Sequence, residues 1–417
     1  MVQLYSRKWR RGILSSLICY IRDAIVLILP IKRLPDFLIK LLYGLEVKFV
    51  FLVHPRNYQD VFISAPFLKP IKLLLRKSIA FRLVSRMNPF VLNTVWTKQG
   101  VNGFVIAQLT VPEIMFEQRT LTLDMLRKAL LLASKISGLE TVVGLGGWFP
   151  MISRRGVSLV EYAKSLGLRI TNGHGGTLAS IYMTVEKIAK IGNFKLEELS
   201  LAIIGVGKMG ANVAKVFNND VKRLVLVDIN GNALEKLKGT LRAQNSKTQI
   251  EAILSTSNIS IRDVLKKCHL GICATSSVRN LVKLRDLPNG FIMLDDSRPE
   301  AIPRDPKKEK IVLEGGLLKI KDVKINYDYG LGQDENVFGC LGEAFLLALD
   351  QSRILNPTLG DVEMNNFFNL LEFCKRNKVT EGDFKSSNYL ISAEDVRDAL
   401  STRHSEIKKI QNEFSIS

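Results

Sequence analysis

Short apolar runs alternate with longer amphipathic stretches along most of the chain. The short runs are rich in Val, Ile and Leu, which favours strands buried on both faces, whereas the longer stretches have the spacing of helices. The strands expected on this basis are 104–107, 141–143, 199–204, 223–228, 270–273, 291–294 and 311–313, and the helices are 123–136, 159–165, 178–191, 211–217 and 337–350. Strands that alternate with helices predict an α/β protein.

The chain has 417 residues, which is enough for two or three domains with sizeable cores. We expect a Rossmann-type, doubly wound dinucleotide domain, a mixed α/β substrate domain and C-terminal helices. The expected segments are a basic, apolar extension at 1–48, a substrate and catalytic domain at 49–195, the dinucleotide domain at 197–320 and a helical region at 330–417 that packs on the substrate domain.

A glycine-rich turn follows the strand expected at 199–204 and precedes a helix. In this turn Gly205 suits the tight bend, Gly207 the approach of the backbone to a pyrophosphate, and Gly210 the packing of helix on strand. Lys208 and Met209 lie between the last two glycines. The next strand ends at Asp228, where a carboxylate can accept hydrogen bonds from ribose hydroxyls. This order of strand, glycines, helix, strand and acid predicts an NADH or NADPH site. The alternative is a Rossmann-like domain without a cofactor.

Two further loops are expected to face this cofactor. Thr275 and Ser276 follow the strand at 270–273, and Gly315 and Gly316 follow the strand at 311–313. Ligands of doubly wound sheets bind at the carboxyl ends of the strands, and paired glycines permit close approach of a backbone. Asp295–Asp296, after another strand, is typical of a turn.

The five cysteines and four histidines are scattered, without the spacing of a disulfide framework or of a metal site. We therefore expect no metal and a reducing cytoplasm. Cys340 stands at the start of an expected helix, where the helix dipole lowers the pKa of a thiol. A thiol and a nicotinamide together predict thioester chemistry, in which the thiolate accepts an acyl group. The alternative is a cysteine that packs in the core.

Residues 1–90 carry 16 Lys and Arg against four Asp and Glu, so this part holds a net +12 of the chain's +19. Basic residues are interleaved there with the apolar runs 12–29, 38–53 and 67–87. This pattern favours peripheral helices on an anionic membrane surface, while buried helices, a true anchor and a landing surface for an acidic carrier protein stay as alternatives. We expect no nucleic acid as a partner, because no aromatic-interleaved RNA-binding motif occurs.

Five segments between about Phe49 and Leu349 form a recognisable set. They are Gly144–Phe149, Ile170–Thr177, the glycine-rich turn, Glu314–Gly316 and, above all, Phe338–Ala344. Through these segments the chain resembles the long-chain acyl-[acyl-carrier-protein] reductases, which make fatty aldehydes. The resemblance implies that Cys340 accepts the acyl group, that Glu343 and His54 are catalytic residues, and that His174 takes part in proton transfer. It also implies an acyl carrier protein or coenzyme A thioester as substrate.

Cofactor choice is the point where this chain departs from that family. The resemblance implies NADPH, whereas Asp228 would repel the 2′-phosphate and so favours NADH. Residues 1–48 have no counterpart in the family.

Two other functions stay open at this point. The turn at Ile203–Gly210 also resembles that of glutamyl-tRNA reductase, but the nucleophilic cysteine motif near the amino terminus of that enzyme is missing, since Cys19 lies in an apolar run. A membrane-associated, NAD-binding module without catalysis is the second alternative, and an inert Cys340 would favour it.

Overall fold

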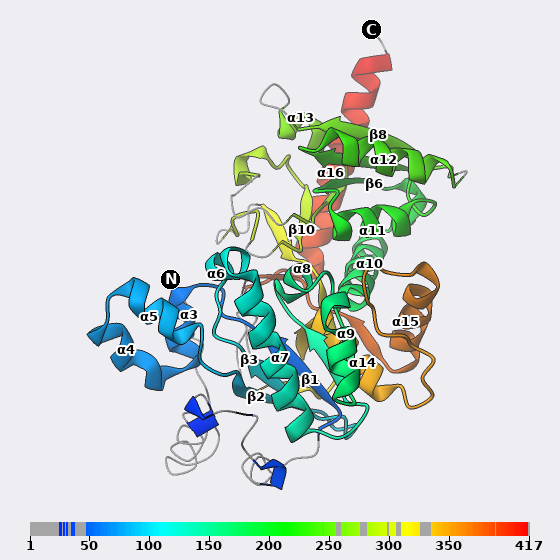
Figure 1. Ribbon diagram of the computed structural model, residues 1–417. Coiled ribbons are helices and arrows are strands. Elements are labelled where there is room, and N and C mark those ends of the chain that lie inside the picture. Colours follow the sequence, from blue (N-terminus) through cyan, green and yellow to red (C-terminus); the bar gives the residue numbers. More distant parts are fainter. Residues whose placement is uncertain are drawn as a thin grey trace. The chain divides into compact units, whose positions relative to one another are not determined.

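The protein, seen here as a computed structural model, consists of two compact units (Figure 1). Unit 1 comprises Met1–Gly176 and Ile320–Lys378, and unit 2 comprises Thr177–Lys319 and Val379–Ser417. The structure describes residues 25–26, 28–29, 31, 35–37, 47–244, 246–255, 260–275, 282–297, 300–305, 310–325, 335–387 and 389–415. Most of 1–48, including Cys19, therefore lies outside the described residues.

Unit 1 is built on a mixed sheet with the strand order β13-β2-β3-β1-β4-β5. Its strands are β1 (Phe49–Val53), β2 (Phe90–Trp96), β3 (Gly103–Ala107), β4 (Val142–Leu145), β5 (Arg169–Thr171) and β13 (Lys324–Ile325). Strands β3, β1, β4 and β5 are parallel, and β2 and β13 extend one edge by antiparallel pairing. The buried, continuous run of β1 fits its central place, because a parallel strand covered on both faces needs apolar side chains throughout.

Helices and short 3-10 turns accompany this sheet. They are α3 (Tyr58–Ser64), η2 (Pro66–Leu68), α4 (Lys69–Leu74), α5 (Lys77–Val84), α6 (Pro112–Glu117), α7 (Arg119–Ile136), α8 (Phe149–Ile152), η3 (Val157–Leu159), α9 (Val160–Ser165), α14 (Gly339–Leu349) and α15 (Met364–Arg376). On α7, Leu126, Leu130 and Ala133 recur at helical spacing and are fully buried in the core. The same core holds Phe104 of β3 and Leu145 of β4.

Unit 2 is a doubly wound parallel sheet with the strand order β11-β10-β9-β6-β7-β8. Its strands are β6 (Ser200–Ile204), β7 (Arg223–Asp228), β8 (Gln249–Leu254), β9 (Leu270–Cys273), β10 (Ile292–Asp295) and β11 (Ile311–Glu314). Every pair along this order is parallel. The strand order reverses at β6, which lies between β7 and β9, and such a switch point is where open α/β sheets bind ligands.

Helices and smaller strands complete the chain. The helices are α10 (His174–Ile191), whose first turn belongs to unit 1, α11 (Lys208–Phe217), α12 (Gly231–Arg242), α13 (Ile261–Leu265) and α16 (Ala393–Ser415), with η4 (Leu196–Glu198) and η5 (Leu284–Asp286); the strands are β12 (Leu317–Ile320), β14 (Asn336–Phe338), β15 (Val379–Glu381), β16 (Lys385–Ser386) and β17 (Tyr389–Leu390). The fully buried Arg403 fixes α16 within unit 2 by donating a 2.9 Å hydrogen bond to the carbonyl oxygen of Cys268.

The structure confirms the α/β class and the Rossmann-type domain. The boundaries of the units differ from the sequence-based prediction, because α10 is divided between the two units and α16 belongs to unit 2. The helix expected to begin at Val337 begins at Gly339, since Val337 and Phe338 form part of β14. None of the described helices is both long and apolar enough to cross a membrane.

Candidate active site

The parallel strands of unit 1 bring three loops to one edge of the sheet. His54 follows β1, Gly146–Trp148 follows β4, and Asn172–His174 follows β5. Because β1, β4 and β5 run in the same direction, their carboxyl ends meet at this edge. The carboxyl edge of such a sheet is the usual place for a ligand.

Helix α14 places Cys340 at the same edge. The ring of Phe345 meets that of Phe49 edge to face at 6.2 Å, at the amino end of β1. At the other end of the helix, a Cβ built on Gly173 would lie 2.3 Å from Cβ of Cys340. The helix therefore runs opposite to the strands and begins where they end. Cys340 is its second residue, near backbone N–H groups that stabilise negative charge.

Cys340 differs from the other described cysteines in its exposure. It is half-buried, whereas Cys268, Cys273 and Cys374 are buried. Burial raises the pKa of each of these three thiols to about 12, which keeps them protonated at neutral pH. The reactive species of cysteine is the thiolate. Thiol chemistry in the described part of the chain is therefore favoured at Cys340.

Glu343, one turn further along α14, is buried and joins four parts of unit 1. Its Oε1 accepts hydrogen bonds from Oγ1 of Thr171 at 2.5 Å and from the backbone N–H of Thr358 at 3.0 Å. Its Oε2 accepts one from the N–H of Gly176 at 2.7 Å. These bonds tie α14 to β5, to the first turn of α10 and to the loop before α15. Sequence reasoning missed Thr358, and Thr171 was signalled only by its place in the motif 170–177.

The glycines of the motif 170–177 pack against the start of α14 and against residues bonded to it. Gly173 has φ +76°, a conformation that favours glycine, and it packs directly on Cys340. A Cβ on Gly176 would lie 2.2 Å from the carbonyl oxygen of Gly339, and one on Gly175 would lie 2.6 Å from Oγ1 of Thr358. Any side chain at these positions would push the first turn of α14 away. The glycines thus determine where the Cys340 thiol lies.

His174 follows the residue that packs on Cys340. Its backbone N–H donates to Oδ1 of Asn172 at 2.9 Å, and its Nδ1 is buried without a hydrogen-bond partner among the described residues. Burial, helped by the charge of Arg155, lowers its pKa to about 4, so the ring is neutral at neutral pH. Arg155 is itself held 3.3 Å from Asp361. A neutral imidazole lies at this edge, and the expected role of His174 in proton transfer stays a prediction.

His54 is engaged on both sides of its ring. Its Nε2 accepts a 2.9 Å hydrogen bond from the N–H of Trp148, and its Nδ1 lies 2.9 Å from the carbonyl oxygen of Pro55, to which it donates in that tautomer. Burial lowers its pKa to about 4. The ring therefore holds the loop after β4. This geometry differs from the expected catalytic role, because neither ring nitrogen is left for proton transfer.

In unit 2 the glycine-rich turn follows β6 as expected. Gly205 has φ +88°, and a Cβ on it would lie 2.9 Å from the carbonyl oxygen of Ala274. A Cβ on Gly210 would lie only 1.9 Å from the carbonyl oxygen of Gly205, so helix and turn touch there. Around Gly207, in contrast, no atom comes within 4 Å of a built Cβ. This open space at the start of α11 is where a pyrophosphate fits against helix N–H groups.

Three side chains near Gly207 are expected to contribute to the cofactor site. Asp228 accepts hydrogen bonds from the N–H of Val206 at 2.7 Å and of Asn230 at 2.9 Å, so it shapes the turn and keeps lone pairs for a ribose. Lys208 is exposed and Met209 half-buried in the first turn of α11. Their positions fit a site for a dinucleotide.

The other expected cofactor loops lie at the same edge of the sheet. The N–H of Thr275 donates to Oγ of Ser297 at 3.2 Å, while Ser276 lies outside the described residues. Cβ atoms on Gly315 and Gly316 would lie 2.8 Å from the backbone nitrogen and 2.6 Å from Oδ1 of Asp296, respectively. The paired glycines are thus explained by packing between strand ends. The expectation that they approach a nicotinamide stays a prediction.

Acidic residues of these loops are structural. Asp295 is fully buried, and its Oδ2 accepts from the N–H groups of Ala301 and Ile302 and from Nη1 of Arg304. Arg304 also donates to Glu314 at 2.9 Å. This agrees with the interpretation of Asp295 as a turn-forming acid. No group of three potential metal ligands occurs in the described ranges.

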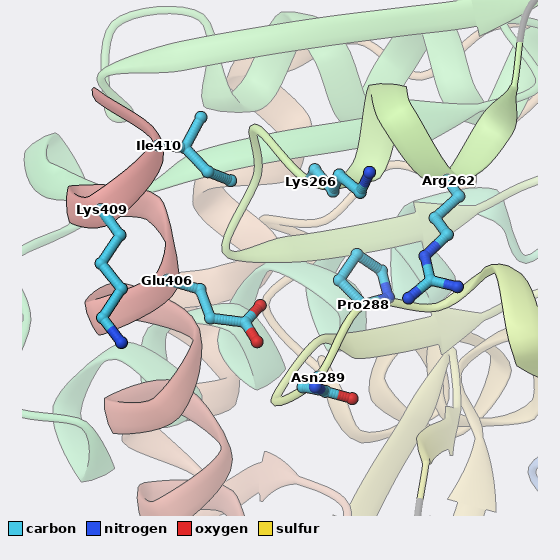
Figure 2. A pocket seen from close by; sticks show the side chains of 7 residues that line it. All are labelled: Arg262, Lys266, Pro288, Asn289, Glu406, Lys409 and Ile410. Atoms are coloured by element: carbon cyan, nitrogen blue, oxygen red, sulfur yellow. The ribbon is translucent and has the colours of Figure 1, made fainter. Parts of the chain in front are cut away.

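A cavity of about 240 Å³ lies at the opposite edge of the unit 2 sheet. Figure 2 shows its lining side chains on α13, on the turn before β10 and on α16. They are Arg262, Lys266, Pro288, Asn289, Glu406, Lys409 and Ile410. Because the turn precedes β10, the cavity lies at the amino ends of the strands. The glycine-rich turn lies at their carboxyl ends, so this cavity is not the dinucleotide site.

Comparisons with known proteins support the assignment of unit 2. Residues 200–273 match the family model described as 3-hydroxyacyl-CoA dehydrogenase, NAD binding domain. The matched residues span the glycine-rich turn and Asp228. The chain thus contains an NAD-binding domain of the dehydrogenase type, and its broad class is that of an oxidoreductase with an NAD-type cofactor. No curated protein matches the chain.

Solved structures resemble the chain only distantly. The nucleotide-binding domain of glutamyl-tRNA reductase from Thermoplasma volcanium has 20% identity and a TM-score of 0.25, with 32% of this chain and 84% of that chain covered. L-tryptophan dehydrogenase from Nostoc punctiforme has 11% identity and a TM-score of 0.37 over 86% of this chain and 89% of that chain. The 5-ketofructose reductase of Gluconobacter sp. strain CHM43 has 11% identity and a TM-score of 0.34 over 78% of this chain and 98% of that chain.

Proposed function

We propose that the protein reduces a fatty acyl thioester, carried by acyl carrier protein or coenzyme A, to a fatty aldehyde with NADH or NADPH. The observation that carries this proposal is the position of Cys340. It is the half-buried cysteine at the first turn of a helix and at the carboxyl ends of the parallel strands of unit 1. The other described cysteines are buried and have raised pKa values. The resemblance to long-chain acyl-[acyl-carrier-protein] reductases supports the same chemistry.

In the first step the Cys340 thiolate attacks the carbonyl carbon of the acyl thioester. The carrier thiolate leaves and takes up a proton, and the acyl group stays on Cys340 as a new thioester. Backbone N–H groups at the start of α14 lie where they stabilise the oxyanion that forms transiently, a contribution that is large in such chemistry. Glu343 keeps this helix end in place through its bonds to Thr171 and Gly176.

A bound reduced nicotinamide supplies the hydride that converts the acyl carbon to the aldehyde. When the bond from that carbon to the Cys340 sulfur breaks, the aldehyde leaves and the thiolate is regenerated. Gly205, Gly207 and Gly210 hold the pyrophosphate in this proposal, and Asp228 holds a ribose. His174, neutral near pH 7, is the candidate for moving a proton at this edge. His54 acts by positioning Trp148 and not by proton transfer.

The test asks whether a thioester adduct forms on Cys340. The protein is incubated with a long-chain acyl thioester without any nicotinamide, and intact mass is followed by peptide mapping. We expect one acyl group per chain on Cys340. Cys340→Ser should lose the adduct and aldehyde production, by a factor of about 10³ or more, and keep nucleotide binding, because a hydroxyl without an adjacent base is a weak nucleophile. Cys374→Ala is the matched control in unit 1 and should keep both.

Three outcomes would count against the proposal. Turnover retained in Cys340→Ser would remove the nucleophile from the mechanism. Absence of an adduct on intact protein that still binds NADH would favour a nucleotide-binding module without this catalysis. Loss of nucleotide binding in the serine variant would show a structural role for Cys340.

A further inference from the structure

A cationic and apolar surface covers α4 and α5 in unit 1. Residues 72–79 are exposed without interruption. Leu73 and Leu74 are 84% and 81% exposed, and Ile79 and Leu83 are 52% and 45% exposed. Single exposed apolar side chains are ordinary, but a cluster of this kind marks a binding surface.

Basic residues surround these leucines, and acids are missing. All six basic side chains of this segment are exposed: Lys69, Lys72, Arg76, Lys77, Arg82 and Arg86. Residues 65–89 contain no Asp or Glu. The surface therefore carries a charge of +6, which repels a second copy of the same surface and attracts an anionic partner. We call residues 69–86 the α4–α5 surface.

The helices of this surface contain two buried residues in the part of the chain that the structure describes. Ala80 and Val84 of α5 are buried, whereas α4 contains no buried residue. A helix of six residues is marginal in water without packing, so α4 lacks the contact that would stabilise it. Figure 1 shows α4 and α5 beside α3. The ammonium group of Lys77 lies 5.7 Å from the ring centre of Tyr58 on α3.

We propose that the α4–α5 surface binds the face of an anionic lipid bilayer. Leu73 and Leu74 enter the boundary between head groups and acyl chains, and the surrounding Lys and Arg side chains contact lipid phosphates. Leu73 and Leu74, 84% and 81% exposed among these charges, favour a lipid surface, because apolar side chains flanked by cations match acyl chains and anionic head groups together. The helix expected over 67–87 is divided at Leu75 and Arg76 into two short helices, so the surface lies on a membrane rather than crossing it. This proposal does not depend on the reaction.

Co-sedimentation with vesicles tests the proposal on the full chain. Vesicles of phosphatidylcholine with about one third phosphatidylglycerol are compared with phosphatidylcholine alone, at low salt and at physiological salt. We expect binding to the anionic vesicles that weakens as salt rises, because the Debye length falls to about 8 Å at physiological ionic strength. Neutral vesicles should bind far less.

Two pairs of variants separate insertion from charge. Leu73→Gln with Leu74→Gln should weaken binding at least ten-fold at all salt concentrations. Lys72→Gln with Arg76→Gln should weaken it about 25-fold at low salt, because each cation contributes about five-fold. Two matched controls should bind like the unmutated protein. One is Leu139→Gln, at a leucine elsewhere in unit 1 that is 85% exposed. The other is Lys164→Gln with Arg127→Gln.

Three results would overturn the proposal. They are equal binding to neutral and anionic vesicles, no effect of the leucine pair, and no binding to anionic vesicles at low salt. If the basic pair instead loses binding to an acidic acyl carrier protein while vesicle binding is absent, the surface serves a protein. All variants should form aldehyde from soluble thioesters at the unmutated rate, so failure here is distinct from failure of the proposed reaction.

Discussion

Two glycine-rich turns in this chain look alike in sequence and do different things. One follows β6 and leads into α11 through Gly205–Gly210, and the other follows β5 and leads into α10 through Gly173–Gly176. Each lies at the carboxyl ends of parallel strands. In both, the first glycine has a positive φ, +88° for Gly205 and +76° for Gly173. The sequence pattern alone makes both of them candidates for binding phosphate.

What lies against the glycines separates the two turns. Space for a Cβ is open at Gly207, so the turn in unit 2 can receive a ligand. At Gly173 and Gly176 the same space is filled by Cys340 and by the carbonyl oxygen of Gly339, so the turn in unit 1 receives another helix of the protein. A glycine-rich turn thus indicates close approach of some backbone or ligand, and the structure decides which. Here one turn is open to a ligand, and the other seats the helix that carries Cys340.

Of the substitutions that test this difference between the two turns, one at Gly173 should have the largest effect. Gly173→Ala places a Cβ 2.3 Å from that of Cys340 in a left-handed conformation, so α14 must shift or the fold must open. We expect the free energy of unfolding to fall by about 3 kcal/mol and acyl-enzyme formation to be lost. Chemical denaturation and intact-mass analysis measure the two effects. Gly138→Ala, where no atom lies within 4 Å of the new Cβ, is the control and should change neither. A Gly173→Ala protein with normal stability would show that α14 is not seated on this turn.

A substitution at Glu343 should have the next largest effect. Glu343→Gln keeps the shape of the side chain but replaces one acceptor oxygen by an NH₂ group, which would face either the N–H of Gly176 or the donors Thr171 and Thr358. We expect a loss of about 2 kcal/mol in the free energy of unfolding. The rate of acyl transfer to Cys340 should fall, while the dissociation constant for NADH stays unchanged, because Glu343 positions α14 and does not touch the cofactor turn. A variant with unchanged acylation would contradict the positioning role.

Sequence patterns predicted the turn in unit 2 better than the one in unit 1, for a physical reason. The run Arg223–Asp228 and the glycines before it are local signals, and the strand β7 has those bounds. The bonds of Glu343 to Gly176 and Thr171 join residues 167 and 172 positions apart, and no local pattern encodes such contacts. The motif around Cys340 was recognisable only by resemblance to a family.

The α4–α5 surface of unit 1 shows the same limit of prediction from local sequence patterns. The segment 67–87 has the composition of one amphipathic helix, yet the chain turns out of helix at Leu75, which adopts an extended conformation. Apolar periodicity predicted the helices but not this break. Likewise the apolar run 38–53 contains β1, whose place at the centre of a sheet depends on pairing with distant strands. Its burial could not be distinguished from membrane contact by composition.

A third and smaller effect tests the open turn. Gly207→Ala adds a methyl group where no protein atom lies within 4 Å and where φ is −61°, so the fold should keep its stability. If a pyrophosphate uses this space, NADH should bind about ten-fold more weakly, and calorimetric titration measures this. Gly239→Ala on α12, also without a neighbour within 4 Å, should leave NADH affinity unchanged and stabilise the helix by about 0.5–1 kcal/mol. Equal NADH affinity in both variants would mean that the cofactor lies elsewhere.

The smallest expected effect concerns cofactor choice at Asp228, and it sharpens what the open turn accepts. The carboxylate adds negative charge where a 2′-phosphate would bind, so we expect the unmutated protein to prefer NADH. Asp228→Asn removes that charge and keeps one acceptor oxygen for the N–H of Val206 or Asn230. The ratio of kcat/KM for NADPH to that for NADH should rise about five-fold, with little change in stability because the side chain is only half-buried. Asp220→Asn is the matched control, since Asp220 bonds Tyr182 at 3.0 Å and not the turn, and its ratio should stay the same. A clear NADPH preference before any substitution would show that Asp228 serves only to shape the turn through Val206.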